Sequence, residues 1–74
     1  MSAIAFALRG EYIELDKLLK ATGLAESGGH ARMLITNGLV QVDGKPESRK
    51  TAKIRAGQHV QLGEQGITIE AGAD

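Results

Sequence analysis

Basic side chains concentrate in one short segment of this 74-residue chain. Within residues 45–55 a single carboxylate, that of Glu47, stands against five cations, which gives a net charge of +4. The five cations are Lys45, Arg49, Lys50, Lys53 and Arg55. Because the chain as a whole is neutral, the remaining residues sum to −4. An Arg guanidinium can bind two phosphate oxygens at once and a Lys ammonium acts as a point charge. The segregated charge therefore predicts one face that binds an anionic partner.

Charge alone leaves a second interpretation of this segment open. Lysines on an exposed strand also protect a sheet edge from pairing with other chains. Between Arg49 and Arg55 the odd positions include three cations, whereas the even positions include Ala52 and Ile54. Side chains alternate between the two faces of an extended strand, so an extended segment would place Arg49, Lys53 and Arg55 on one face.

A glycine pair, Gly28-Gly29, stands where a second helix is expected to begin. Free amides and the helix dipole attract anions at such a position, and glycine lets a phosphate approach closely. The alternative is ordinary helix capping with permissive glycines. His30 follows, either beside the anion or as an exposed polar residue. Arg32 lies on the same helix and extends the basic face from residues 45–55, while Lys17 on the first helix is a further candidate.

Residues that could support catalysis or metal binding are not grouped in this sequence. The chain has no cysteine, and His30 and His59 have no partner at metal-ligand spacing. Ser27 has no evident base, and the neighbouring acidic residues Glu14 and Asp16 are expected to complement the dipole of the first helix. A core of this size leaves little room for an enclosed substrate pocket. We therefore expect a non-enzymatic protein with no metal, no cofactor and no small-molecule substrate.

The elements that must position these residues follow from hydrophobic spacing. Residues 3–8 alternate with a period of two, which predicts a strand. Leu15, Leu18 and Leu19 then share one face of a helix, with Asp16, Lys17 and Lys20 on other faces, and Gly23 fits the position after its end. Ser27 is a suitable N-cap for a second helix, which Asn37-Gly38 ends.

The second half of the chain alternates with the period of strands. Val40 and Val42 lead to Asp43-Gly44, a strong signal for a two-residue turn. Further turns are expected at residues 56–58 and 64–66, around strands at residues 60–62 and 67–69. The predicted fold class is α+β, with two short packed helices against a small antiparallel sheet.

One hydrophobic core should join these elements. The helix-to-helix contact is expected at Ala31, and the remaining core residues are Leu15, Leu18, Leu19, Leu34, Ile35, Val40, Val42, Ile54, Val60 and Leu62.

A set of spaced residues also resembles a known family. The matching pieces are residues 15–19, Ser27, Ala31-Arg32, Leu34-Ile35, Gly38, residues 40–44, and Gly57 ahead of Val60 and Leu62. This pattern resembles the RNA-binding domain named after ribosomal small-subunit protein four, the S-four domain, and the whole chain resembles its small stand-alone bacterial members of the YbcJ type. The resemblance implies an alpha-L RNA-binding motif at about residues 13–62 within one domain, residues 1–74. Glu14 and Gly28 depart from the family pattern, which commonly has Arg at both positions.

The resemblance implies that the basic surface binds structured RNA, with ribosomal and transfer RNA as candidates. The residues assigned to this role are Lys17, Gly28, Gly29, His30, Arg32, Lys45, Arg49, Lys50, Lys53 and Arg55. The alternative hypothesis is a protein-interaction adaptor that uses the basic segment to bind an acidic partner. No apolar run approaches the roughly 20 residues of a membrane span, so we expect no membrane partner and a cytoplasmic protein.

Overall fold

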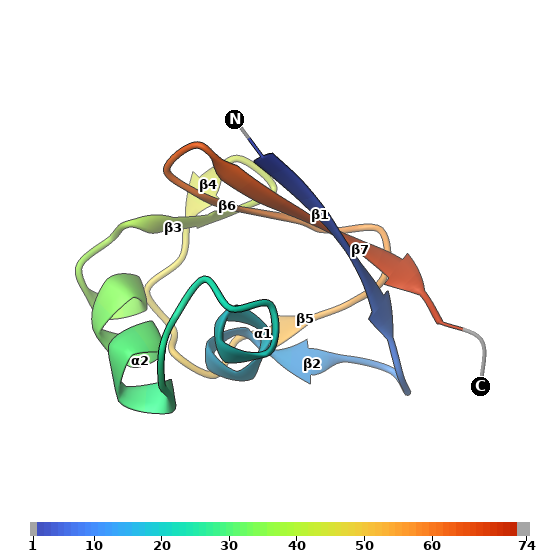
Figure 1. The fold of residues 1–74 in the computed structure, drawn as a ribbon, viewed down its shortest axis with the longest axis horizontal. Coiled ribbons are helices and arrows are strands. Elements are labelled where there is room, and N and C mark those ends of the chain that lie inside the picture. The colour runs from blue at the N-terminus through green and yellow to red at the C-terminus, as the bar shows by residue number, and fades with distance from the viewer. Residues whose placement is uncertain (1, 73–74) are drawn as a thin grey trace.

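A five-stranded sheet and a layer of two helices face each other in the computed structural model, which describes residues 2–72 (Figure 1). In spatial order the sheet contains β1 (Ser2–Leu8), β7 (Gln65–Ala71), β6 (His59–Leu62), β3 (Val40–Val42) and β4 (Lys45–Pro46). The helices are α1 (Leu15–Ala21) and α2 (Gly28–Thr36). A ribbon of β2 (Ile13–Glu14) and β5 (Lys53–Ile54) lies beside α1 (Figure 1). The α+β class with two packed helices is confirmed.

Local signals set the ends of both helices. The Ser27 hydroxyl accepts a hydrogen bond from the backbone N–H of His30 at 3.1 Å, as expected of an N-cap. Beyond α2 the N–H groups of Gly38 and Leu39 donate to carbonyls of the last turn, which satisfies acceptors that the helix leaves free. Helix α1 begins only at Leu15, because the two residues before it pair with β5.

The large sheet is mixed, which corrects the expected antiparallel sheet. Strands β1 and β7 run parallel over seven residues, from Ser2 opposite Gln65 to Leu8 opposite Ala71. The other pairs, β7 with β6, β6 with β3 and β3 with β4, are antiparallel. A tight turn can join antiparallel strands only, whereas parallel strands need a long crossover. Here the crossover is the entire chain between Leu8 and Gln65, so turn signals gave no indication of this pairing.

Two-residue turns join the antiparallel strands that are consecutive in the large sheet, β3 with β4 and β6 with β7. Asp43 and Gly44 link β3 to β4 with φ angles of 53° and 85°, the combination of a type I′ turn, so this turn is confirmed. The turn between β6 and β7 is Gly63-Glu64, slightly earlier than the expected turn at residues 64–66. Gly63 has a φ of 62°, which a glycine adopts without strain, and the turn therefore closes there.

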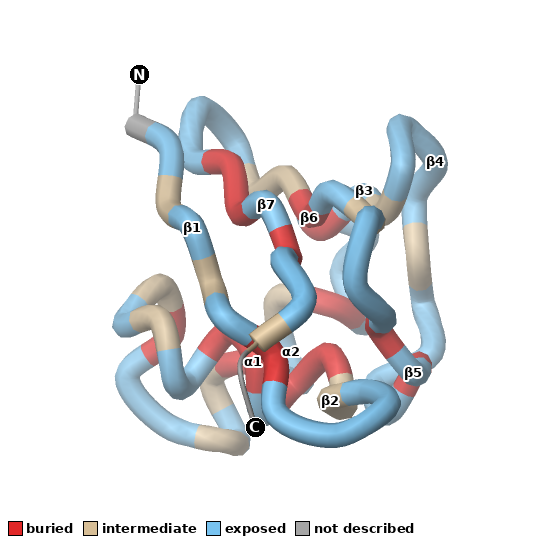
Figure 2. Tube along the Cα trace, turned by 90° about the vertical axis from the view of Figure 1, so that its right-hand side faces the viewer, coloured by how far each residue is buried: buried red, intermediate tan, exposed pale blue. Residues whose placement is uncertain are grey.

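The core lies where the sheet meets the helical layer (Figure 2). The predicted core residues that are buried are Leu15, Leu18, Leu19, Ala31, Ile35, Val40, Ile54 and Val60. Leu34, Val42 and Leu62 are only half-buried and pack against this core, the latter two because they are the last residues of their strands. The parallel pair adds core residues that the sequence analysis omitted, namely Leu8, Ile67 and Ile69.

Candidate nucleic-acid interface

The N-terminus of α1 is capped by the backbone of the basic segment. The side chain of Glu14, the N-cap residue, accepts no backbone N–H of the helix. Instead the N–H of Leu15 donates to the carbonyl of Ala52 at 2.9 Å, and the N–H of Asp16 donates to the carbonyl of Lys50 at 3.1 Å. These two bonds satisfy amides that a helix start leaves free. They also fix residues 50–52 against the first turn of α1.

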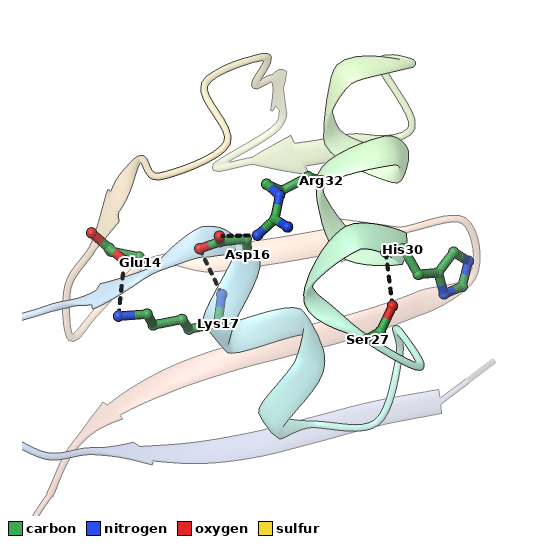
Figure 3. Close-up of polar contacts among 6 residues, drawn as sticks. All are labelled: Glu14, Asp16, Lys17, Ser27, His30 and Arg32. Carbon is green, nitrogen blue, oxygen red and sulfur yellow. Dashed lines mark hydrogen bonds and ion pairs between the residues drawn. The ribbon is translucent and has the colours of Figure 1, made fainter.

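Asp16 links the same helix end to α2. Its carboxylate is buried, and it accepts the backbone N–H of Lys17 at 2.8 Å and the Nη1 group of Arg32 at 3.5 Å (Figure 3). A Cβ atom at Gly28 would lie 3.3 Å from that Nη1, so the glycine leaves room for the Arg32 side chain. Asp16 was expected on a helix face other than that of the leucines, and the structure adds that its carboxylate is buried beside Arg32. Half of the Arg32 side chain remains exposed.

His30 contributes to capping at the start of α2. While its N–H donates to Ser27, its ring Nδ1 accepts the N–H of Glu26 at 3.0 Å. The ring is therefore held by the backbone that precedes the helix, and Figure 3 shows the bond from the His30 N–H to Ser27. This geometry confirms Ser27 as the N-cap, whereas His30, expected beside an anion or as an exposed polar residue, is half-buried and bound to the backbone; an anion at Gly28-Gly29 stays a prediction.

Two further cations are held by carboxylates close in sequence. The guanidinium of Arg49 binds both carboxylate oxygens of Glu47, at 3.1 and 3.2 Å, and the Arg49 N–H adds a third bond at 2.9 Å. The bonds from the Arg49 side chain and N–H lower the pKa of Glu47, and the bonds to Glu47 raise the pKa of Arg49. Lys17 forms an ion pair with Glu14 at 3.2 Å (Figure 3).

Lys53 and Arg55 lie on the outer face of the β2–β5 ribbon. Ile13 pairs with Ile54, and Ile54 is buried, so the neighbouring residues Lys53 and Arg55 point outward. Both cations lie over the ring of Tyr12, at 5.0 Å for Lys53 Nζ and 5.7 Å for Arg55 Cζ, within the range of a cation–π contact. Sequence reasoning did not assign Tyr12 to the site. No local pattern in the sequence indicates Tyr12, because its contact with Lys53 and Arg55 depends on the register of the β2–β5 ribbon.

Six of the predicted cations thus surround the N-terminus of α1, and we call them the basic face. They are Lys17, Arg32, Arg49, Lys50, Lys53 and Arg55. A hollow of about 480 Å³ lies within it, lined by Arg49, Thr51, Ala52 and Lys53. Lys45 lies elsewhere, on β4 at the edge of the large sheet, whereas β5 lies beside α1 (Figures 1 and 2).

Across residues 2–72, no group of three or more His, Cys, Asp or Glu side chains is placed to hold a metal ion. Within the same residues, no helix is long and apolar enough to cross a membrane.

The fold and the basic face are together those of a small nucleic-acid-binding domain, and the comparison with known families agrees with this class. The model of the S4 domain family matches residues 6–70, so the chain belongs to that family. YbcJ of Escherichia coli (strain K12) is 43% identical over 60 residues, which cover 81% of this chain and 86% of that protein. YbcJ of Shigella flexneri matches to the same extent. The solution structure of YbcJ from E. coli, described as revealing an αL motif involved in RNA-binding, superposes with a TM-score of 0.71 and 41% identity over 90% of this chain and 86% of that chain.

Proposed function

We propose that this protein binds structured RNA through the basic face and has no catalytic role. One observation carries the proposal: the carbonyls of Lys50 and Ala52 cap α1, which fixes the basic segment beside Arg32. Cations from α1, α2 and the β5 segment thereby form one surface. Membership in the S4 family and the αL motif of the related YbcJ structure support the same function.

RNA is the anion that this arrangement suits. Side chains cannot enter the deep, narrow groove of an A-form helix, so proteins recognise its shape through phosphates and 2′-hydroxyls. Among the described residues, Lys50, Lys53 and Arg55 have no carboxylate within ion-pair distance, whereas Lys17, Arg32 and Arg49 are paired. We infer that the three unpaired cations meet phosphate first, and that the paired ones exchange a carboxylate for phosphate.

The proposal includes the extent of the RNA-binding unit and its location. We assign the RNA-binding motif to residues 13–62 within a single domain, since these residues supply all six cations of the basic face. Ribosomal and transfer RNA are the structured RNAs that we consider first. Both are abundant in the cytoplasm, so we place the protein there.

Titration of an RNA hairpin at several salt concentrations tests the proposal. Each neutralised phosphate contributes about −0.7 to −0.9 to the slope of log affinity against log salt, so three contacts give about −2 to −3. Lys50→Ala and Lys53→Ala should each weaken binding and reduce this slope by about one contact. Lys20→Ala is the matched control, because Lys20 lies in the last turn of α1, at the end opposite to the basic face. A slope near zero, or equal losses in the control, would contradict the proposal.

Gly29 allows a separate test of the anion site at α2. A Cβ atom there would lie 3.9 Å from the Ser27 hydroxyl, an ordinary contact, so Gly29→Ala is compatible with the fold. If a phosphate approaches these amides, the methyl group should weaken RNA binding while the stability of the helix is retained or improved. Unchanged affinity would leave capping as the only role of Gly28-Gly29.

The adaptor hypothesis makes the opposite prediction. Binding of an acidic polypeptide together with indifference to RNA, measured with the same variants, would replace the RNA proposal. Lys45→Ala should leave RNA affinity nearly unchanged, because Lys45 lies on β4 and outside the basic face.

A further inference from the structure

We propose that a hollow beside Tyr12 binds one unpaired nucleobase next to an RNA helix, with Lys53 and Arg55 holding its phosphate. This inference rests on the proposed function and adds to it a second kind of contact. It assigns the protein to RNA sites where a duplex adjoins an unpaired nucleotide.

The ribbon explains why an aromatic ring stands among cations. In the antiparallel pair, Ile13 lies opposite Ile54 and Glu14 opposite Lys53, so the register places Tyr12 opposite Arg55. Residues that face each other across a ribbon have side chains in contact. Tyr12 is 39% exposed, so part of its ring surface is open to a ligand.

The ring borders a hollow of suitable size and lining. Its volume is about 410 Å³, within the usual range for small-ligand sites. The residues that line it are Phe6, Ala7, Leu8, Arg9, Tyr12 and Ile13. Most of this lining is apolar, and a single cation, Arg9, belongs to it. A flat, apolar group of a few rings can therefore be accommodated beside Tyr12.

Charge complementarity selects a nucleotide as the occupant. Arg9 lines the apolar hollow, and Lys53 and Arg55 lie over the Tyr12 ring that borders it, so a ligand that combines a flat apolar group with a negative charge fits this place. An unpaired nucleotide meets both needs, because its base stacks on aromatic rings and its phosphate attracts Arg and Lys. A second hollow, of about 430 Å³, is lined by Leu39 and its neighbours and includes no charged or aromatic residue. That hollow has no charged side chain to bind a phosphate, and it serves as the control site.

The site is continuous with the basic face. Lys53 lies over the Tyr12 ring and also lines the hollow that contains Arg49 and Thr51. A strand that leaves a duplex held on the basic face therefore passes Lys53 before it reaches Tyr12. The geometry points to a nucleotide immediately beyond the last base pair.

Binding of two RNA hairpins tests the inference in the unmodified protein. One hairpin has a blunt stem, and the other carries one unpaired adenosine after its 3′ end. Base stacking on an aromatic side chain corresponds to roughly fivefold to hundredfold in affinity, so the overhang should strengthen binding at least about fivefold. Tyr12 is the only tyrosine and the chain has no tryptophan, so its ring protons are readily assigned by NMR. The overhang should shift these protons to higher field, and the blunt hairpin should not.

Variants of Tyr12 distinguish loss of the aromatic ring from loss of the folded structure. Tyr12→Phe keeps the ring and should retain the gain from the overhang, whereas Tyr12→Leu should abolish the gain, so that this variant binds the two hairpins equally. Leu39→Ala, which alters the other hollow, should leave the gain unchanged. Equal binding of the two hairpins by the unmodified protein would overturn this inference and leave the proposed function standing. Failure to bind either hairpin would overturn both.

Discussion

Glu47 restrains Arg49, an exposed arginine of the basic face. Its carboxylate binds the Arg49 side chain and backbone, so phosphate must compete with a carboxylate that is already in place. Two further ion pairs also place a carboxylate against a cation of the basic face, namely those of Arg32 with Asp16 and of Lys17 with Glu14. The face is thus partly neutralised by its own carboxylates, which favours moderate affinity and ready release.

Removal of the Glu47 charge should therefore strengthen RNA binding. In Glu47→Gln the guanidinium of Arg49 is freed and a repulsive charge is lost. The gain should be about two- to fivefold, since exposed ion pairs are worth up to about 1 kcal/mol. Glu70→Gln on β7 removes the same charge away from the face and is the control in a hairpin titration. Equal effects of the two substitutions would show that only net charge matters.

The same carboxylate makes stability depend on pH. The pKa of Glu47 lies below its ordinary value of 4.5, so its bonds stabilise the fold above that pH, and this contribution disappears as pH falls through the lower folded-state pKa. Asp43 acts in the same sense, because bonds from the His59 N–H and the Gln58 side chain lower its pKa. Urea unfolding from about pH 6 to about pH 3 should show a loss that is smaller in Glu47→Gln than in the unmodified protein. Parallel curves would refute the assignment to Glu47.

Two adjacent residues of α2 should differ in their contribution to stability. Ile35 is fully buried, whereas Leu34 is half-buried at the margin of the core. Ile35→Ala should cost about 2–5 kcal/mol, a large share of the roughly 5–15 kcal/mol of a typical domain. Leu34→Ala should cost clearly less, which urea denaturation of both variants will measure. A larger loss for Leu34 would mean that α2 is rotated from the position described here.

At the scale of elements, α1 and the basic segment depend on each other. The helix obtains its cap from the carbonyls of Lys50 and Ala52, and the segment obtains its position from the helix. Insertion of two glycines between Lys50 and Thr51 breaks this link and removes no charge. We expect a loss of roughly 1–3 kcal/mol for two backbone bonds, and weaker RNA binding although every cation remains.

The control is an insertion of two glycines between Gly63 and Glu64. That turn joins β6 to β7 and lies outside the basic face, so its insertion should lower stability and leave RNA affinity unchanged. RNA affinity is measured by titration at a temperature where all variants are folded. Full affinity in the Lys50 insertion would show that the cations need no fixed arrangement.

Elements with local signals were predictable from the sequence, and those that depend on distant pairing were not. The Ser27 cap, the end of α2 at Asn37-Gly38 and the Asp43-Gly44 turn each follow from a few adjacent residues, and all three are present. The alternation of buried and exposed residues from Ala52 to Arg55 was also correct. The role of Asp16 and the position of Tyr12 depend on partners far along the chain, for which no local pattern exists.

At the scale of the whole molecule, the two ends of the described chain pair with each other in the large sheet. The pairing of β1 with β7 joins residues about sixty positions apart, and its inward residues complete the core. No turn or spacing marks such a contact, and this explains why the sequence analysis expected hairpins alone. The elements that carry the basic face lie between these strands in the sequence, so the pairing of β1 with β7 joins the two ends of the segment that contains them.

The parallel direction of β1 and β7 has a mechanical consequence. Ala3 lies near the start of β1 and Glu70 near the end of β7, so a force that separates them slides one strand along the other. All hydrogen bonds between the strands then bear the load together. By contrast, His59 and Thr68 face each other at the open end of the β6–β7 hairpin, and a force between them breaks the bonds one after another.

Single-molecule pulling of two double-cysteine variants tests this difference. The chain has no cysteine, so pulling linkers attach only at the introduced thiols, Ala3→Cys with Glu70→Cys in one variant and His59→Cys with Thr68→Cys in the other. Forced unfolding is governed by the unfolding rate along the pulled direction, and we expect the first pair to resist a distinctly higher force than the second.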